Sequence, residues 1–318
     1  MIKGFWAGVG FAALASSATA QDQPFCQREI VVLGAGQDAG APQIGNADDA
    51  GPRLLPSSIA LINRAQGTRY LFDATPAITE QLAMLDTIEP PKAGLGVDGV
   101  FLTHAHIGHY LGLAYFGREA ANANNVPVYA MPRMAEFLRT NGPWSQLVEL
   151  ENIDLTALGD DNTLHAVAIS PELAAVALPV PHRDEFSETV GWTVMTPARR
   201  ALYLPDLDSW EEWEGLTGRS LVERVAMVDF AFVDAAFWDD NELLDENGEG
   251  RDMSEIPHPR VTQTMDLLQD LPASERAKVH FIHYNHTNPI RDPDSLESKQ
   301  VIERGFKIAR RGDRICLD

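Results

Sequence analysis

Three histidines within six residues place the strongest constraint on the fold of this chain. His104, His106 and His109 follow directly after residues 97–102, an apolar segment typical of a buried strand. Imidazoles that alternate across the turn after a strand can converge on one point, and imidazole is a preferred ligand of zinc and related metals. The alternative, three unrelated structural histidines, explains this spacing less economically. The motif therefore predicts a metal site at the edge of a sheet.

Short apolar segments alternate with helical ones along the rest of the chain. This pattern indicates one α/β domain with its sheets in layers, and we see no internal repeat. The strands expected from apolar runs include 29–33, 97–102, 225–233 and 280–283, and the expected helices include 76–85 and 110–123.

Charge narrows the range of partners. Asp and Glu number 46 against 25 Lys and Arg, which gives a formal net charge of −21. A field of this sign repels phosphate backbones and anionic membrane surfaces. We therefore expect no nucleic-acid partner and favour a small-molecule substrate.

The N-terminus has the three parts of a secretory signal. Lys3 supplies a positive charge, residues 5–14 form a short apolar run, and Ala18-Thr19-Ala20 is a small-residue cleavage site. The apolar run is too short to span a bilayer, and no later run is long enough. We expect cleavage near Ala20 and a periplasmic or secreted domain over residues 21–318. An ordinary buried N-terminal helix is the alternative.

Two cysteines, Cys26 and Cys316, stand near the ends of the expected mature chain. Exported proteins with an even number of cysteines usually pair them, and chain ends often lie close together in compact domains. We therefore expect a Cys26–Cys316 disulfide, with two free thiols as the alternative.

The histidine motif resembles that of a known superfamily. His-x-His-x-Gly-His, starting at His104, is similar to the His-x-His-x-Asp-His signature of the metallo-β-lactamase fold. Other positions similar to the superfamily pattern are found in order along the chain: Asp73 before the motif, and His182, Asp206 and His283 after it. The resemblance implies an αββα sandwich.

The resemblance covers roughly residues 28–318. Within the superfamily, residues 37–43 and 286–289 look like the branch of pyrroloquinoline-quinone biosynthesis protein B (PqqB). That branch typically carries a cysteine cluster where this chain has Gly45-Asn46, so we expect no structural zinc there.

The resemblance also implies a set of metal ligands. His104, His106 and His182 would hold a first metal, His109 and His283 a second, and Asp206 would bridge the two. Imidazole and carboxylate ligands suit a divalent ion, with zinc as the expected metal and iron or manganese as alternatives.

One position departs from the superfamily motif. Gly108 stands where the motif has an aspartate that binds the second metal, so the second site is expected to be weaker and a mononuclear centre is an alternative. Asp184, Asp208 and His286 are candidates to replace the missing ligand. Restoring the carboxylate with Gly108→Asp is expected to raise the metal stoichiometry towards two.

A further histidine is a candidate general acid. The segment from Asp234 to His258 is similar to a segment of the tRNA-processing nuclease branch, which places a proton-donating histidine there. We expect His258, Asp234 and Asp206 to be catalytic, with Asp234 orienting the imidazole of His258. The alternative is a histidine in a surface loop. His165 and His280 are expected to be structural.

These observations favour an exported metal-dependent hydrolase. Its substrate would be a small ester, lactone, amide or phosphodiester, attacked through a metal-bound hydroxide. One alternative is a PqqB-like metal-dependent oxygenase or a factor in cofactor biosynthesis. The other is a metal-binding protein without catalytic activity.

Overall fold

The computed structural model describes residues 26–46, 49–159, 165–244, 247–253 and 256–318. The expected signal peptide and its cleavage site near Ala20 lie outside these residues.

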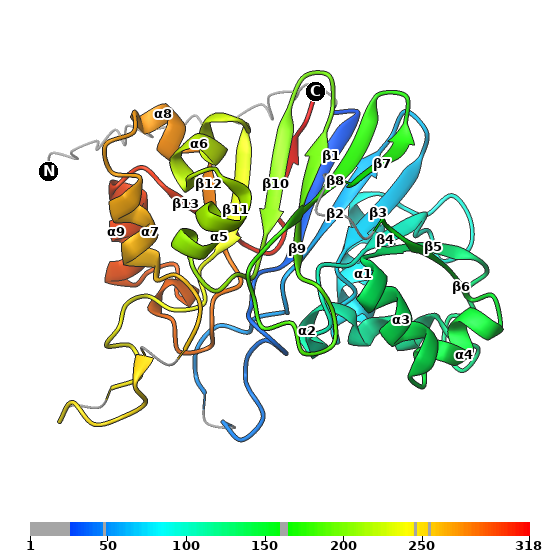
Figure 1. Ribbon diagram of the computed structural model, residues 1–318, viewed down its shortest axis with the longest axis horizontal. Coiled ribbons are helices and arrows are strands. Elements are labelled where there is room, and N and C mark those ends of the chain that lie inside the picture. The colour runs from blue at the N-terminus through cyan, green and yellow to red at the C-terminus, as the bar shows by residue number, and fades with distance from the viewer. Residues whose placement is uncertain (1–25, 47–48, 160–164, 245–246, 254–255) are drawn as a thin grey trace, which may run out of the picture.

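Two mixed sheets pack face to face, and helices cover the outer face of each (Figure 1). Each has seven strands over the described residues. The first runs in the order β14(Arg314–Cys316), β1(Arg28–Gly34), β2(Ser58–Asn63), β3(Thr68–Phe72), β4(Gly99–Phe101), β5(Val126–Ala130), β6(Ile153–Ala157). The second runs β13(Lys307–Ile308), β12(Val279–Ile282), β11(Phe230–Asp234), β10(Arg200–Leu204), β9(Val190–Met195), β8(Leu173–Pro179), β7(His165–Ser170).

The helices fall into two groups along the chain. Beside the first sheet lie α1(Ile78–Ile88), α2(Ile107–Tyr110), the 3₁₀ helix η1(Leu111–Phe116), α3(Pro132–Thr140) and α4(Trp144–Glu149). Beside the second lie α5(Trp210–Thr217), α6(Leu221–Ala226), α7(Val261–Leu267), α8(Ala273–Arg276) and α9(Leu296–Glu303), with the 3₁₀ helix η3(Pro289–Arg291) before α9. Side-chain caps begin several of them; Ser220 and Glu223, for example, form a capping box on α6.

Aromatic side chains join the two sheets. The ring of Phe101 in the first sheet stacks on Phe72 at 4.8 Å and meets Trp192 of the second sheet edge-on at 5.0 Å. Trp192 and Tyr203 are fully buried in this core. The expected αββα sandwich of the metallo-β-lactamase type, in a single domain, is confirmed.

Parallel strands bring the functional segments to one edge. β3 pairs parallel with β4, and β10, β11 and β12 are mutually parallel in the second sheet. The carboxyl ends of parallel strands lie at the same edge of their sheet. The segments after these strands meet at the lower edge in Figure 1, where α2 lies. This edge carries the histidine motif.

The expected helix over 110–123 is wrong. Instead, α2 ends at Tyr110 and η1 ends at Phe116. Gly112 lies so close to the backbone after β3 that an added Cβ would be 2.1 Å from the carbonyl oxygen of Thr75. This contact holds the segment against the sheet in short turns. The other expected helix, 76–85, is α1, shifted to Ile78–Ile88.

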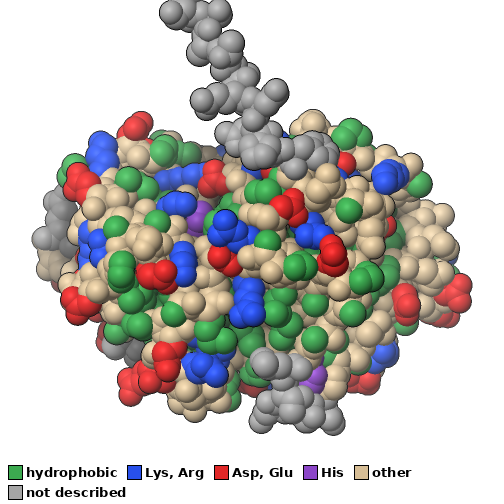
Figure 2. Space-filling view, turned by 90° about the horizontal axis from the view of Figure 1, so that it is seen from above, with side chains coloured by type: hydrophobic (Ala, Val, Ile, Leu, Met, Phe, Trp, Pro, Cys, Tyr) green, Lys and Arg blue, Asp and Glu red, His purple; other side chains and the backbone are tan. Residues whose placement is uncertain are grey.

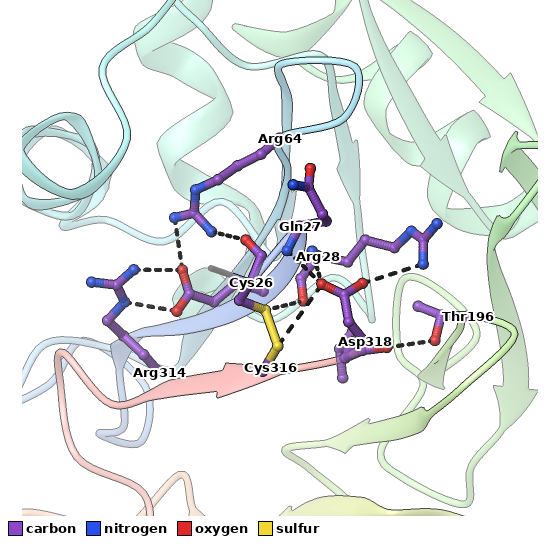
Figure 3. The surroundings of a disulfide bond; sticks show 10 residues. Cys26, Gln27, Arg28, Arg64, Thr196, Arg314, Cys316 and Asp318 are labelled. Carbon is purple, nitrogen blue, oxygen red and sulfur yellow. Dashed lines mark hydrogen bonds and ion pairs between the residues drawn. A yellow bond between two sulfur atoms is a disulfide. The ribbon is translucent and has the colours of Figure 1, made fainter. Parts of the chain in front are cut away.

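The chain ends are joined as expected. Cys26 and Cys316 form a disulfide, with 5.7 Å between their Cα atoms (Figure 3). Beside it, Arg64 and Arg314 both bind the carboxylate of Glu29, with N–O distances of 2.8 and 2.7 Å. The two neighbouring strands β1 and β14 are thus held together by a covalent bond beside them and by ion pairs.

We expect that replacing both cysteines by serine will lower the free energy of unfolding by about 2–4 kcal/mol. The disulfide closes a loop with a sequence separation of 290, so it removes many conformations from the unfolded chain. Denaturant unfolding of both forms, without reductant, measures the difference. Equal unfolding midpoints and slopes would contradict the expectation.

Acidic and basic side chains are interspersed over the face shown in Figure 2, which lies opposite the edge that carries α2. None of the helices in the described part of the chain is long and apolar enough to span a bilayer.

His280 is buried in β12, where the centre of its ring lies 5.2 Å from that of Phe232. It packs within the fold, as expected.

Candidate metal centre

Four side chains form a first cluster at this edge. His104, His106, His182 and Asp206 each offer one ligand atom, and these atoms lie within 4.8 Å of one another. The carboxylate of Asp206 is 3.4 Å from His104 Nε2 and 3.3 Å from His182 Nε2. His106 Nδ1 is 3.2 Å from His182 Nε2. The residues expected at the first metal are therefore together.

The other nitrogen of each of these rings has a partner of its own. His104 Nδ1 lies 3.0 Å from Thr103 Oγ1, and His182 Nδ1 lies 2.8 Å from Asp208 Oδ1. His106 Nε2 lies 3.2 Å from a carboxylate oxygen of Glu185. Such contacts fix the tautomer of a metal-binding imidazole and leave the inward nitrogen without a proton.

The histidine expected at a second metal is oriented in the same way. His109 Nδ1 donates to Asp73 Oδ2 at 2.8 Å, and its Nε2 lies 3.8 Å from Asp206 Oδ2. Asp73 also accepts hydrogen bonds from Thr103 and Tyr203. Asp73, which the superfamily pattern matched, thus orients His109 and links it to the strand ends.

A second cluster shares Asp206 with the first. It contains Asp206, Asp234, His258 and His283, again with ligand atoms within 4.8 Å of one another. His283 Nε2 is 3.7 Å from Asp206 Oδ2, and the rings of His283 and His109 are 5.3 Å apart. Both histidines expected at the second metal, His109 and His283, therefore lie beside Asp206, although His109 belongs to neither cluster.

His258 differs from the histidines of the first cluster in the partner of its Nε2 atom. Its Nδ1 donates to Asp234 Oδ2 at 2.7 Å, which is the expected pairing. Its Nε2 points instead to the Gln37 amide nitrogen at 3.4 Å. The ring is buried rather than in an exposed surface loop.

Burial and charge set the ionisation of the centre. Burial is the largest cause that holds the pKa of His104 well below its usual range, and His109 adds to it. Burial would raise the pKa of Asp206, but the charges of the surrounding histidines, His182 first, hold it well below its ordinary range. A neutral imidazole and an ionised carboxylate are the forms that bind a cation.

His258 is shifted in the opposite direction. Burial alone would lower its pKa, but the charges of Asp234 and Asp206 outweigh this and raise the pKa to about 9.

The residues fit a cation. Three buried groups at the centre hold atoms with no hydrogen-bond partner in the described part of the chain: His104 Nε2, Asp206 Oδ1 and both ring nitrogens of His283. Buried polar atoms are nearly always satisfied, so convergent orphans of this kind require a partner that the protein does not supply. A divalent metal ion suits this set of nitrogen and oxygen atoms.

The three residues suggested as replacements for the missing aspartate have other contacts. Asp208 binds the outer nitrogen of His182, Asp184 pairs with Arg133 at 3.2 Å, and His286 lies 3.9 Å from a carboxylate oxygen of Asp49. None of them belongs to either cluster described above.

Gly108 cannot simply regain the motif aspartate. A Cβ at this position would lie 2.4 Å from the carbonyl oxygen of Asp38 and 2.9 Å from its carbonyl carbon. Gly108→Asp would therefore displace the backbone after β1, and the expected rise in metal stoichiometry does not follow from this geometry.

Backbone conformation marks the same region. Asp38, Asp73, His258 and His283 all have positive φ, between 48° and 95°. Such conformations are uncommon for residues other than glycine and cluster at functional sites, where the surrounding structure holds them.

A cavity of about 670 Å³ opens beside the centre. Asp208, His258, Arg260, Met253 and Ile256 are among the residues that line it. Volumes of this size are typical of small-molecule sites.

This edge, where two helix-covered mixed sheets bring histidines and aspartates together, defines the class of protein. The family described as "Beta-lactamase superfamily domain" matches residues 68–284, and the chain belongs to this superfamily.

Relatives narrow the comparison to one branch. The chain is 26% identical to "Coenzyme PQQ synthesis protein B" of Cupriavidus necator, over 91% of this chain and 99% of the relative. The crystal structure of zinc-bound PqqB from Methylobacterium extorquens is similar with a TM-score of 0.70 and 21% identity, over 90% of this chain and 99% of that one. A diphosphatase from the PhnP family is similar with a TM-score of 0.59 and 20% identity, over 91% and 96%. The resemblance to the PqqB branch is confirmed.

Proposed function

We propose that the protein is a metal-dependent hydrolase that acts on a small ester, lactone, amide or phosphodiester. The observation that carries this proposal is the pair of clusters that share Asp206, with buried ring and carboxylate atoms that have no hydrogen-bond partner among the described residues. His104, His106 and His182 would hold a first metal, and His109 and His283 a second, with Asp206 between them. A bound divalent ion would acidify a water molecule and polarise the bond under attack.

The surrounding residues keep this arrangement ready for catalysis. Asp208 and Asp73 hold His182 and His109 in the tautomer that leaves Nε2 free. Zinc is the ion we propose, because imidazoles dominate the ligand set and the similar PqqB structure of M. extorquens is zinc-bound.

His258 would supply the proton to the leaving group. Asp234 accepts from Nδ1, so Nε2 is the atom that would donate to a leaving group, and His258 is one of the residues that line the cavity. A leaving group would take the place of the Gln37 amide as the partner of Nε2.

A second candidate function rests on the relatives. Proteins named for coenzyme PQQ synthesis match nearly the whole chain, which favours a metal-dependent oxygenase or a factor in cofactor biosynthesis. A metal-binding protein without catalytic activity is the third possibility.

Turnover of a substrate panel separates these functions. The metal-loaded protein is assayed with a nitrophenyl ester, a lactone, an amide and a phosphodiester, in air and without oxygen. A hydrolase turns over at least one of them equally in both atmospheres. Turnover that requires oxygen would favour the oxygenase, and tight metal binding without any turnover would favour the non-catalytic protein.

We further propose that residues 1–20 are removed on export and that 21–318 is the mature domain. The Cys26–Cys316 disulfide supports this, because such bonds persist in oxidising compartments. N-terminal sequencing of protein from the periplasm or medium should give Gln21 as the first residue. A mature protein that starts at Met1 would contradict the proposal.

A further inference from the structure

The backbone of the turn after β1 lies directly against Gly108. The missing side chain at position 108 leaves room that the backbone of Asp38 fills, since an added Cβ would meet its carbonyl oxygen at 2.4 Å. A glycine at this position in the motif is therefore a requirement of the turn, and the turn brings a different aspartate to the histidine motif.

The turn that carries Asp38 is held in place from several sides. Gln37 N donates to Tyr284 O at 3.0 Å, and Gly40 N donates to Gln37 O at 2.9 Å. The side chain of Asn285 donates to Gln37 Oε1 at 2.6 Å. Tyr284 and Asn285 directly follow His283, so the turn is fixed to the segment that carries a residue of the second cluster.

Asp38 lies beside the histidine motif, because a Cβ at position 108 would be 3.0 Å from the Cα of Asp38. Burial lowers the pKa of both His109 and His258, whereas nearby carboxylates, Asp38 among them, raise both. Asp38 is only partly exposed; within the described residues its carboxylate has no hydrogen bond or salt bridge, and it belongs to neither cluster of convergent ligand atoms. A half-buried carboxylate without a protein partner, beside two histidines of the centre, is available to a cation.

We propose that Asp38 supplies the carboxylate that Gly108 lacks and is a ligand of the second metal, with His109, His283 and Asp206. The site would take a divalent ion that accepts mixed imidazole and carboxylate ligands, such as zinc, iron or manganese. This inference rests on the metal centre of the proposed function. It predicts a centre for two ions despite the altered motif.

The test is the metal content of Asp38→Asn compared with the wild type. Asparagine tolerates positive φ, so the turn, where φ at residue 38 is 48°, should persist. Apo protein is titrated with zinc against a chromophoric chelator, and the bound metal is counted by elemental analysis. The wild type should bind two equivalents, and Asp38→Asn should bind one tightly and the second at least about 100-fold more weakly, beyond the effect usual for residues that only orient a ligand.

Asp184→Asn is the matched control, because Asp184 is an exposed aspartate that pairs with Arg133. It should bind two equivalents with wild-type affinity. Thermal unfolding of the apo forms checks folding, and Asp38→Ser is a second variant should the asparagine form unfold at a lower temperature.

Two results would overturn the inference: equal binding of both equivalents by the wild type and a folded Asp38 variant, or a wild type that binds one equivalent only. Neither readout depends on turnover. A protein that loses its second equivalent as expected, yet hydrolyses nothing, contradicts the proposed function and leaves the assignment of Asp38 in place.

Discussion

Replacing His182 by alanine is expected to remove the first metal and to lower hydrolysis by at least about 10³-fold. The Nε2 atom of His182 is 3.3 Å from Asp206 and 3.2 Å from His106, so its loss leaves the first cluster with three ligands. Lewis-acid activation of water is worth several kcal/mol, and each 1.36 kcal/mol is a factor of ten in rate. Elemental analysis and initial rates at saturating substrate measure the two effects.

Two control variants accompany this experiment. Asp208→Asn removes the group that orients His182 but no ligand, and we expect a loss of about 10–100-fold in metal affinity. His286→Ala removes a histidine outside both clusters and should leave metal content and rate unchanged. A His182→Ala protein that keeps its full metal content would show that the first cluster is not the binding site.

Replacing His258 by alanine is expected to lower turnover by about 10²–10⁴-fold while the metal content stays the same. The loss should appear with substrates whose leaving group needs a proton, such as alkyl esters. Nitrophenyl substrates should lose much less, because their leaving group departs as an anion. The ratio of rates for the two substrate types, in wild type and variant, is the quantity to measure.

Asp234→Asn provides a related test, because it removes the acceptor that binds His258 Nδ1 at 2.7 Å. It should show the same dependence on the leaving group. His258 also belongs to the second cluster. If the His258→Ala protein loses metal, His258 is a metal ligand and not the general acid. Equal losses on both substrate types would likewise exclude the acid role.

Much of the centre could be predicted from the sequence because its residues stand at strand ends. His104, Asp206 and His283 each follow an apolar run, and parallel strands carry such residues to one edge without any long-range information. The disulfide could be predicted for a similar reason, since Cys26 precedes the first strand of the chain and Cys316 lies in the last.

What sequence patterns missed depends on contacts between distant segments. Asp38, the proposed ligand, lies in a turn after β1, and the close approach of its backbone to Gly108 connects it with the histidine motif. The sequence makes Asp208 a candidate metal ligand, whereas in the structure it binds the outer nitrogen of His182. Its position two residues after Asp206 was the available signal, but spacing does not say which atom a carboxylate meets.

The same limit explains the wrong helix over 110–123. Its apolar pattern favours a continuous helix, but Gly112 packs directly against the backbone after β3. This tertiary contact lies within η1, where the chain forms a short 3₁₀ helix in place of a continuous α-helix.

The central claim, that this edge of the sandwich is a hydrolytic metal centre, is tested most directly by measuring hydrolysis as metal is returned to the apo protein. Zinc is added in steps, and the rate on the best substrate of the panel is recorded together with the bound metal. We predict that the rate rises with the metal bound, falls to background with a chelator, and is independent of oxygen. A fully loaded protein that hydrolyses no member of the panel, or a rate that does not change when the metal is removed, would contradict the claim.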